Sequence, residues 1–365
     1  AESVADLNLA IRDAQAAAGG APPNDLLDQR DLVLQQLSEQ IAIDVVDQDD
    51  GGVSVFVGNG QALVLGGDAS QLTLAQSEFP SADPEVALLT ATGTTMPLVN
   101  VSGGEIGGLL DFRREMLDPA RNTLGQLAIG LTEAMNAQNR AGMDLDGKLG
   151  GDLFSVGAPA VTASTNKTGG GDVGVQVVSA SGLTPSDYLL DFDGGSYTLT
   201  RLDTGVAVPM TGSGTALDPF VADGLSLTVN APPAAGDSFL IRPTTAAAGD
   251  FGVVLSDPRG IAAAVPIVSA AELTNTGTGA IAGDRVIDPT DPALLDSVTI
   301  EFLDAGNYSI NGAGSFPYTA DAPITVNGWE VTISGAPDAG DVFTVTSNAG
   351  GVGDNRNALA LSCLL

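Results

Sequence analysis

Two stripes of apolar residues at helical spacing open the chain. The first contains Val4, Leu7 and Ile11, and a segment rich in Gly and Pro at 19–23 ends it. A second stripe follows Asn24, which we expect to be the N-cap of a second helix. The pattern therefore predicts a helical hairpin. The leucines expected on the packing face of its second helix are Leu27, Leu34 and Leu37.

After the hairpin the apolar period changes from helical spacing to two. Between residues 41 and 74, Val53 and Val55 alternate with polar or small residues, and turns rich in Asp, Asn and Gly lie at 49–52 and 58–60. Alternation of this kind is typical of half-buried strands joined by tight turns. We therefore expect short antiparallel strands in this part of the chain.

Helical spacing returns at Ile106 and leads into a longer amphipathic stretch. Asp118 and Pro119 are expected to be the N-cap and first-turn residue of a run that ends at Arg140. About 22 residues at 1.5 Å each make a rod roughly 33 Å long, which is typical of a helical bundle. Its leucines Leu124, Leu127 and Leu131, like those of the hairpin, are expected to lie mostly in the core of this chain, with a minority facing a neighbouring subunit.

Beyond residue 165, short alternating segments rich in Gly, Thr, Ser, Val and Asp contain an internal repeat. A repeat of roughly a hundred residues has the size of a domain, so it predicts two homologous β domains in tandem. The matching positions are Asp193, Gly195 and Tyr197 with Asp304, Gly306 and Tyr308, and Thr228, Val229, Gly236, Asp237 and Phe239 with Thr332, Ile333, Gly340, Asp341 and Phe343.

These patterns predict an α+β multidomain fold, in which a helical bundle domain with a small β element carries two tandem all-β domains as an insertion. We expect the last segment of the chain, 353–365, to return and pack against helices of the first 150 residues. The expected limits are 1–165 with 351–365 for the helical domain, 41–100 for its β element, 166–264 for the first β domain and 265–350 for the second.

Composition narrows the possible functions. The chain of 365 residues has no His, a single Cys at position 363 and a formal net charge of −32. Without His the usual metal and general-base chemistry of that side chain is excluded, and one Cys makes no internal disulfide. The strong negative charge makes nucleic acid and anionic membranes poor partners, and no stretch has the roughly 20 apolar residues of a membrane-spanning helix. We also expect the chain to be a piece of a longer protein that carries no signal peptide.

Carboxylates that lie close in sequence are the main candidates for chemistry. They could in principle form the acid–base pair of a glycosidase or a calcium site, but the spacing specifies neither, and Asp beside Gly is typical of solvated turns. The Gly-rich runs 103–104 and 169–172 lack the sequence context of a phosphate-binding loop. We predict no catalytic, metal or cofactor site and no enzyme. The carboxylates concerned are Asp47, Asp49, Asp50, Asp144, Asp146, Asp191 and Asp193.

Aromatic residues at the repeated positions have two interpretations. They could stack on carbohydrate, or they could pack in the cores of the two β domains, and their equivalent strand positions favour the core. The residues are Tyr197, Phe239, Tyr308, Trp329 and Phe343.

Four motifs, in order along the chain, resemble a known family. They are 23–31 (PNDLLDQRD), 58–67 (GNGQALVLGG), 104–125 (GEIGGLLDFRREMLDPARNTLG) and 353–361 (GDNRNALAL). Together they resemble bacterial flagellar hook-associated protein 1, the first hook–filament junction protein. The resemblance covers the first 160 or so residues and the last dozen, and it is looser in the repeated β region.

The resemblance implies a structural axial protein of the bacterial flagellum that joins hook to filament and is assembled extracellularly after type III export. It implies as partners the hook protein, the next junction protein, copies of the protein itself in a ring, and an export chaperone bound through a C-terminal segment outside this sequence. It implies no cofactor. The residues alone leave two alternatives: an adhesin-like binding module of tandem β domains on a helical stalk, and a polysaccharide-acting enzyme that uses paired Asp residues.

Overall fold

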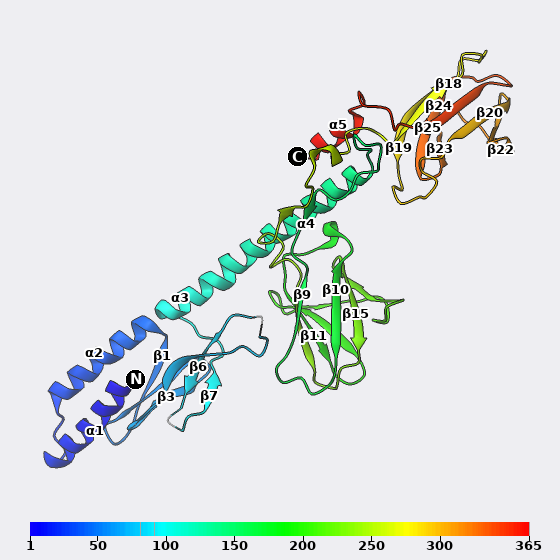
Figure 1. The fold of residues 1–365 in the computed structure, drawn as a ribbon. Coiled ribbons are helices and arrows are strands. Elements are labelled where there is room, and N and C mark those ends of the chain that lie inside the picture. The colour runs from blue at the N-terminus through cyan, green and yellow to red at the C-terminus, as the bar shows by residue number, and fades with distance from the viewer. Residues whose placement is uncertain (81, 91, 365) are drawn as a thin grey trace. The chain divides into compact units, whose positions relative to one another are not determined.

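The computed structural model describes residues 1–80, 82–90 and 92–364, and it has the predicted α+β character (Figure 1). By its internal contacts the chain forms two compact units. One consists of Ala1–Gln126 with Ala158–Ala246, and the other of Leu127–Gly157 with Ala247–Leu365. These units divide the chain at other positions than the predicted domains do, and the domain limits stay a prediction.

The first two helices, α1 (Glu2–Ala17) and α2 (Asn24–Gln40), pack on each other as the predicted hairpin. The predicted N-cap role of Asn24 is wrong, because Asn24 is already helical and Pro23 occupies the cap position. The carbonyl of Pro23 accepts hydrogen bonds from the N–H groups of Leu26 and Leu27, so the helical hydrogen bonding begins one residue earlier than expected.

Two small antiparallel sheets follow the hairpin, as the alternating pattern predicts. Buried residues of the first sheet, among them Val55, share a core with Val4 of α1, Ile41 at the end of α2 and Leu88 of the second sheet. The strands, in sheet order, are β1 (Ile43–Asp47), β2 (Val53–Val57), β3 (Gln61–Leu65) and β4 (Asp68–Ala69), then β5 (Gln71–Ala75), β6 (Glu85–Leu89) and β7 (Thr95–Pro97).

The next helical segment is continuous from α3 (Gly104–Phe112) through a π turn (Arg113–Leu117) into α4 (Asp118–Arg140) (Figure 1). The predicted helix start at Asp118 is therefore wrong, since that residue has helical backbone angles (φ −66°, ψ −45°) and its N–H donates to the carbonyl of Arg113. A proline ring normally clashes with the carbonyl four residues before it. We attribute the tolerance of Pro119 inside a continuous helix to the wider π turn that precedes it.

Two β regions have the same sheet topology. In the first, a five-stranded sheet has the order β13-β12-β11-β16-β9 and a three-stranded sheet the order β10-β15-β14; in the second, the orders are β22-β21-β20-β25-β18 and β19-β24-β23. All pairs are antiparallel, and each strand of the first region has one counterpart in the second. This correspondence supports the proposed duplication.

The first β region consists of β9 (Ala160–Ala163), β10 (Asp172–Val177), β11 (Tyr188–Phe192), β12 (Tyr197–Arg201), β13 (Ala207–Val208), β14 (Phe220–Ala222), β15 (Leu225–Ala231) and β16 (Ser238–Arg242). The second consists of β18 (Ile267–Ala271), β19 (Ala280–Val286), β20 (Val298–Asp304), β21 (Asn307–Ile310), β22 (Ala313–Pro317), β23 (Pro323–Val326), β24 (Trp329–Ser334) and β25 (Val342–Ser347). Between them β17 (Gly252–Val253) pairs with β8 (Phe154–Ser155), and α5 (Arg356–Ser362) follows the second region.

Aromatic residues at the repeated positions lie in the cores of the β regions. Phe239, Tyr308, Trp329 and Phe343 are buried, which confirms the interpretation of these four as core residues and removes them as a carbohydrate platform. Tyr197 is half-buried and packs against the ring of Phe192 at a centroid distance of 4.6 Å.

Each β region also contains one buried aspartate that fastens a loop by backbone hydrogen bonds. The carboxylate of Asp237 accepts N–H groups from 168, 169 and 234, and that of Asp341 accepts those of 276, 277 and 338. Burial acts to raise the pKa of Asp237 and of Asp341. In both cases the hydrogen bonds to the carboxylate outweigh burial, so the pKa of each carboxyl lies below its ordinary value.

We expect these aspartates to make the β regions sensitive to acid. A carboxyl with a lowered pKa in the folded state stabilises the fold above its unfolded pKa, near 3.9, and this stabilisation is lost as the pH falls through the folded pKa. Asp341→Asn should therefore destabilise the protein at pH 7, and the difference from the parent should shrink at pH 3. Denaturant unfolding at both pH values measures this. Asp338→Asn, an exposed neighbour, is the control, and an equal loss for Asp341→Asn at both pH values would contradict the expectation.

At Gly125, helix α4 lies very close to the backbone of Thr244. A Cβ atom at this position would lie 1.9 Å from the carbonyl oxygen of Thr244, far inside van der Waals contact. Only a residue without a side chain allows this approach.

Alanine at the two interior glycines of α4 should have opposite effects. Alanine favours a helix over glycine by about 1 kcal/mol, so Gly130→Ala, where nothing lies within 4 Å of the added Cβ, should be neutral or stabilising. Gly125→Ala should instead lower the free energy of unfolding by about 1–3 kcal/mol, because the helix must move away from Thr244. Urea unfolding of the two variants measures the difference, and a stabilised Gly125→Ala would show that the close approach does not exist in solution.

Candidate functional site

Helix α4 has one face that is buried although it is mostly polar. The buried positions follow each other at steps of three and four, as one face of a helix requires. We call it the amide face, because several of its residues have amide side chains. Each amide can both donate and accept hydrogen bonds. The buried residues are Asn122, Gly125, Ile129, Thr132, Asn136 and Asn139.

In the first compact unit, amide side chains of α4 form hydrogen bonds with segments next to the strands of the first β region. Gln126 Nε2 donates to the carbonyl of Leu183 at 2.7 Å, and Asn122 accepts the hydroxyl of Thr245 at 3.0 Å. Asp187 lies beside Asn122 and pairs with Arg242 at 3.1 Å. Burial raises the pKa of Asp187 despite the nearby guanidinium.

In the second compact unit the same face of the helix binds the backbone at the start of strand β8 and at residue 262. Asn136 Oδ1 accepts the N–H groups of Leu153 and Phe154 at 2.8 and 3.0 Å, and its Nδ2 donates to the carbonyl of Phe154 at 2.8 Å. Asn139 Oδ1 accepts the N–H of Ala262 at 2.9 Å. These bonds give buried backbone groups of both segments a hydrogen-bond partner.

The end of the chain is fixed on α4 by another amide pair. Gln138 Nε2 donates to Asn357 Oδ1 at 2.6 Å, and Asn357 Nδ2 donates to the carbonyls of Gln138 and Ala262 at 3.1 and 2.6 Å. Asn357 belongs to the motif at 353–361. The predicted return of the last segment to the long helix is confirmed by these contacts.

A second set of α4 residues forms an exposed apolar face. Leu124 and Leu127 are 58% and 67% exposed, and Leu117, at the end of the π turn, is exposed as well. Leu117, Leu124 and Leu131 follow one another at seven-residue steps, with Leu127 between them, which is the spacing of a helix that packs along another helix. Leu131 is half-buried.

Leu124 and Leu127 lie outside the core, and their place in the minority expected to face a neighbouring subunit stays a prediction. The physical reason for their exposure is the amide face, which takes the inward side of the helix. The leucines of α2 face inward. Leu34 and Leu37 pack against the core of the hairpin and small sheets, and Leu27 is half-buried.

Exposed apolar side chains also precede α4 on the same continuous helical segment. Leu109, Phe112 and Met116 are all more than half exposed. A row of large apolar side chains of this length is unusual on the surface of a soluble protein and marks an interaction surface. We call residues 109, 112, 116, 117, 124 and 127 the apolar stripe.

A buried arginine in the motif at 23–31 was missed in the sequence. Arg30 of α2 donates from Nη1 to the carbonyl of Gly51 at 2.8 Å and to the side chain of Asn8 at 3.3 Å. Asn8 is fully buried and bonds Val53 and Gly66. An arginine between aspartates reads as a surface residue, and its partners are distant in sequence, so no local signal identified it.

Two of the carboxylates considered for chemistry lie in strands, Asp47 in β1 and Asp191 in β11, and several of the others shape turns. Asp193 Oδ1 accepts two N–H groups of its own turn, Asp144 Oδ1 accepts those of Asp146 and Lys148, and Asp50 accepts that of Gly52. Among residues 1–80, 82–90 and 92–364, no group of three or more acidic or Cys side chains could hold a metal ion. In the same part of the chain, no helix combines the length and apolar character that a membrane span requires.

Family models match two parts of the chain. The model of the helical domain of flagellar hook-associated protein FlgK matches residues 1–154, and that of the D2-like domain of flagellar hook-associated protein 1 matches residues 161–243.

Curated proteins and a solved structure agree with these matches. Flagellar hook-associated protein 1 of Escherichia coli K12 is 38% identical over 266 residues, and that of Salmonella typhimurium LT2 is 36% identical over 267 residues; each alignment covers 72% of this chain. The chain spans about half the length of these relatives, 48% in each case. The structure of the flagellar hook junction protein FlgK from Burkholderia pseudomallei matches all of this chain and 72% of its own, at 35% identity and a TM-score of 0.88. The chain belongs to the flagellar hook-associated protein 1 family.

Proposed function

We propose that this chain is the central part of a structural axial protein that joins the hook of the bacterial flagellum to its filament. The observation that carries the proposal is the apolar stripe, found on the helical domain of a member of this family. A surface built for helix packing serves assembly. The closest candidate carboxylates, Asp144 and Asp146, share one turn in which Asp144 accepts backbone N–H groups and Asp146 pairs with Arg259, which is a structural arrangement.

The apolar stripe is the surface through which we expect the protein to assemble. Its seven-residue spacing fits a second amphipathic helix laid along α4, with leucines of both helices interlocked. In water the free stripe is unfavourable, because exposed apolar surface costs about 25 cal/mol per Å². Covering it during assembly therefore contributes driving force.

Family membership supports the finer parts of the proposal. The protein would be exported through the type III apparatus and assembled extracellularly, on the flagellum. Its partners would be the hook protein, the next junction protein and copies of itself in a ring, with an export chaperone bound through a segment outside this chain. The predicted domain limits belong to the same proposal, with the two β regions as domains inserted in the helical one.

Polar substitution of the apolar stripe should separate assembly from folding. Leu124→Asn with Leu127→Asn should change the free energy of unfolding of this chain by no more than about 0.5 kcal/mol, because both side chains are exposed. In the full-length protein, the same pair should leave cells with hooks that lack filaments. Urea unfolding and electron microscopy of a complemented deletion strain measure the two effects.

The matched control is Leu273→Asn, which replaces a fully exposed leucine of the second β region. It should leave both stability and filaments unchanged. Normal filaments on cells that carry the Leu124 and Leu127 variant would contradict the role of the apolar stripe, and cells without any hooks would contradict a place at the junction.

A further inference from the structure

The second β region leaves and rejoins the rest of its compact unit at one joint. Its incoming and outgoing segments lie side by side there, since Asn348 N–H donates to the carbonyl of Pro266 at 2.8 Å and Asn348 Nδ2 to that of Val265 at 2.9 Å. The strands that continue from them, β18 and β25, pair from Ile267 with Ser347 onward. The joint is therefore the place where the orientation of the region is set.

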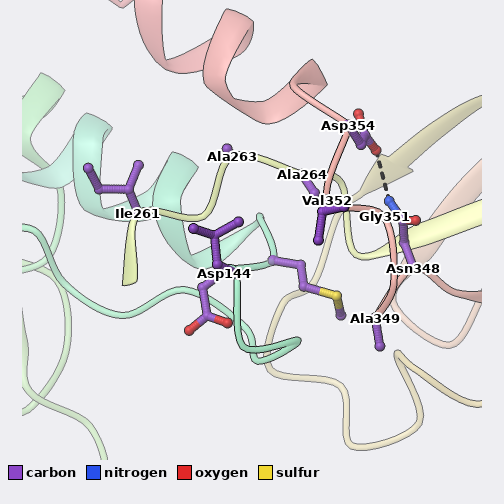
Figure 2. Close-up of a pocket in the computed structure, with 11 residues that line it drawn as sticks. Asp144, Ile261, Ala263, Ala264, Asn348, Ala349, Gly351, Val352 and Asp354 are labelled. Carbon is purple, nitrogen blue, oxygen red and sulfur yellow. Dashed lines mark hydrogen bonds between the residues drawn. The ribbon is translucent and has the colours of Figure 1, made fainter. Parts of the chain in front are cut away.

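Asp354, just before α5, joins both segments to the final helix. Its Oδ2 accepts Nδ2 of Asn348 at 2.8 Å (Figure 2) and the N–H of Val265 at 3.4 Å. Arg356 binds the same carboxylate through Nε and Nη2, at 3.1 and 2.8 Å. The charge of Arg356 holds the pKa of Asp354 below its ordinary value.

Arg356 also reaches into the second β region. Its Nη1 donates to Asp284 Oδ2 at 2.8 Å, and its Nη2 to the carbonyl of Ile267 at 3.3 Å. Asp284 lies on β19 where the register with β24 shifts, its side chain is only 7% exposed, and within the described residues its Oδ1 has no hydrogen-bond partner. A carboxylate so far removed from water needs a cation beside it.

Apolar packing at the joint is incomplete, although Met143 and Ala264 are buried there. A cavity of about 40 Å³ lies there, with Ile261, Val352 and Asp354 among the residues that line it (Figure 2). Val352 is 81% exposed and Ile261 is exposed as well. Leu149 packs against the core of the second β region, so apolar contact and the polar contacts both hold the region at the joint.

We propose that Arg356 is a latch that fixes the second β region on the base formed by α4 and α5. One guanidinium connects Asp354 of the base with Asp284 of the β region, and its planar fork reaches both carboxylates and a carbonyl at once. Lysine has the charge but not the fork, so it cannot make the same set of bonds. Without the latch the region stays folded and moves about the joint, as weakly packed domains do by default.

The native Cys363 allows a direct test of this motion. Cys363 is exposed at the end of α5, and Ser315 is exposed on β22, so spin labels at Cys363 and at Ser315→Cys report the distance between base and β region. In the parent the distribution should be narrow. Arg356→Lys and Asp284→Asn should each broaden it about twofold or more.

The matched control is Arg285→Lys, which changes the residue next to Asp284 on β19. Arg285 pairs at 3.0 Å with Glu330, which lies inside the same β region, so this variant should keep the narrow distribution. Trp329, the single tryptophan and fully buried in the region, reports by its fluorescence whether the region itself is folded. A broadened distribution with native Trp329 fluorescence supports the latch. Unchanged distributions in both latch variants, or loss of the native Trp329 signal, would overturn it.

Discussion

The buried amide face of α4 is the interaction on which the rest of the structure depends. Segments without regular secondary structure cross this helix, and each brings backbone groups that must find partners once water is excluded. Asn136 alone satisfies two N–H groups and one carbonyl. An unpaired buried group costs about 1–3 kcal/mol, so apolar residues in these places would destabilise every crossing. The helix thus organises the chain by specific hydrogen bonds more than by hydrophobic burial.

The amide face also explains why the apolar stripe is exposed. A helix has room for one inward face, and when amides occupy it, leucines at the other positions must face outward. Leu124 and Leu127 are then exposed in this chain, and exposed apolar surface carries a cost in water. The two faces thus divide the helix: one binds the rest of the chain, and the other leaves apolar side chains at the surface.

Periodicity in the sequence predicted the helices, the antiparallel strands and the duplicated β pattern, because these depend on local spacing. It also showed correctly that Leu124 and Leu127 share a face. Periodicity could not show which face of α4 is buried, because polar residues occupy most of the buried face and leucines lie on the exposed one. The predicted helix starts at Asn24 and Asp118 were wrong because α2 begins with the carbonyl of Pro23 and a π turn precedes Asp118. Neither feature has a clear sequence signal.

The motifs that identify the family mark connections within the chain as much as contact surfaces. Arg30, Asn357 and Arg356 come from two of these motifs, and all three bond to segments far away in sequence. Changing one of these residues leaves its hydrogen-bonding or charged partner without a counterpart. A motif of this kind therefore specifies how the chain closes on itself. At exposed positions such as the apolar stripe, a substitution changes a surface and leaves these internal connections intact.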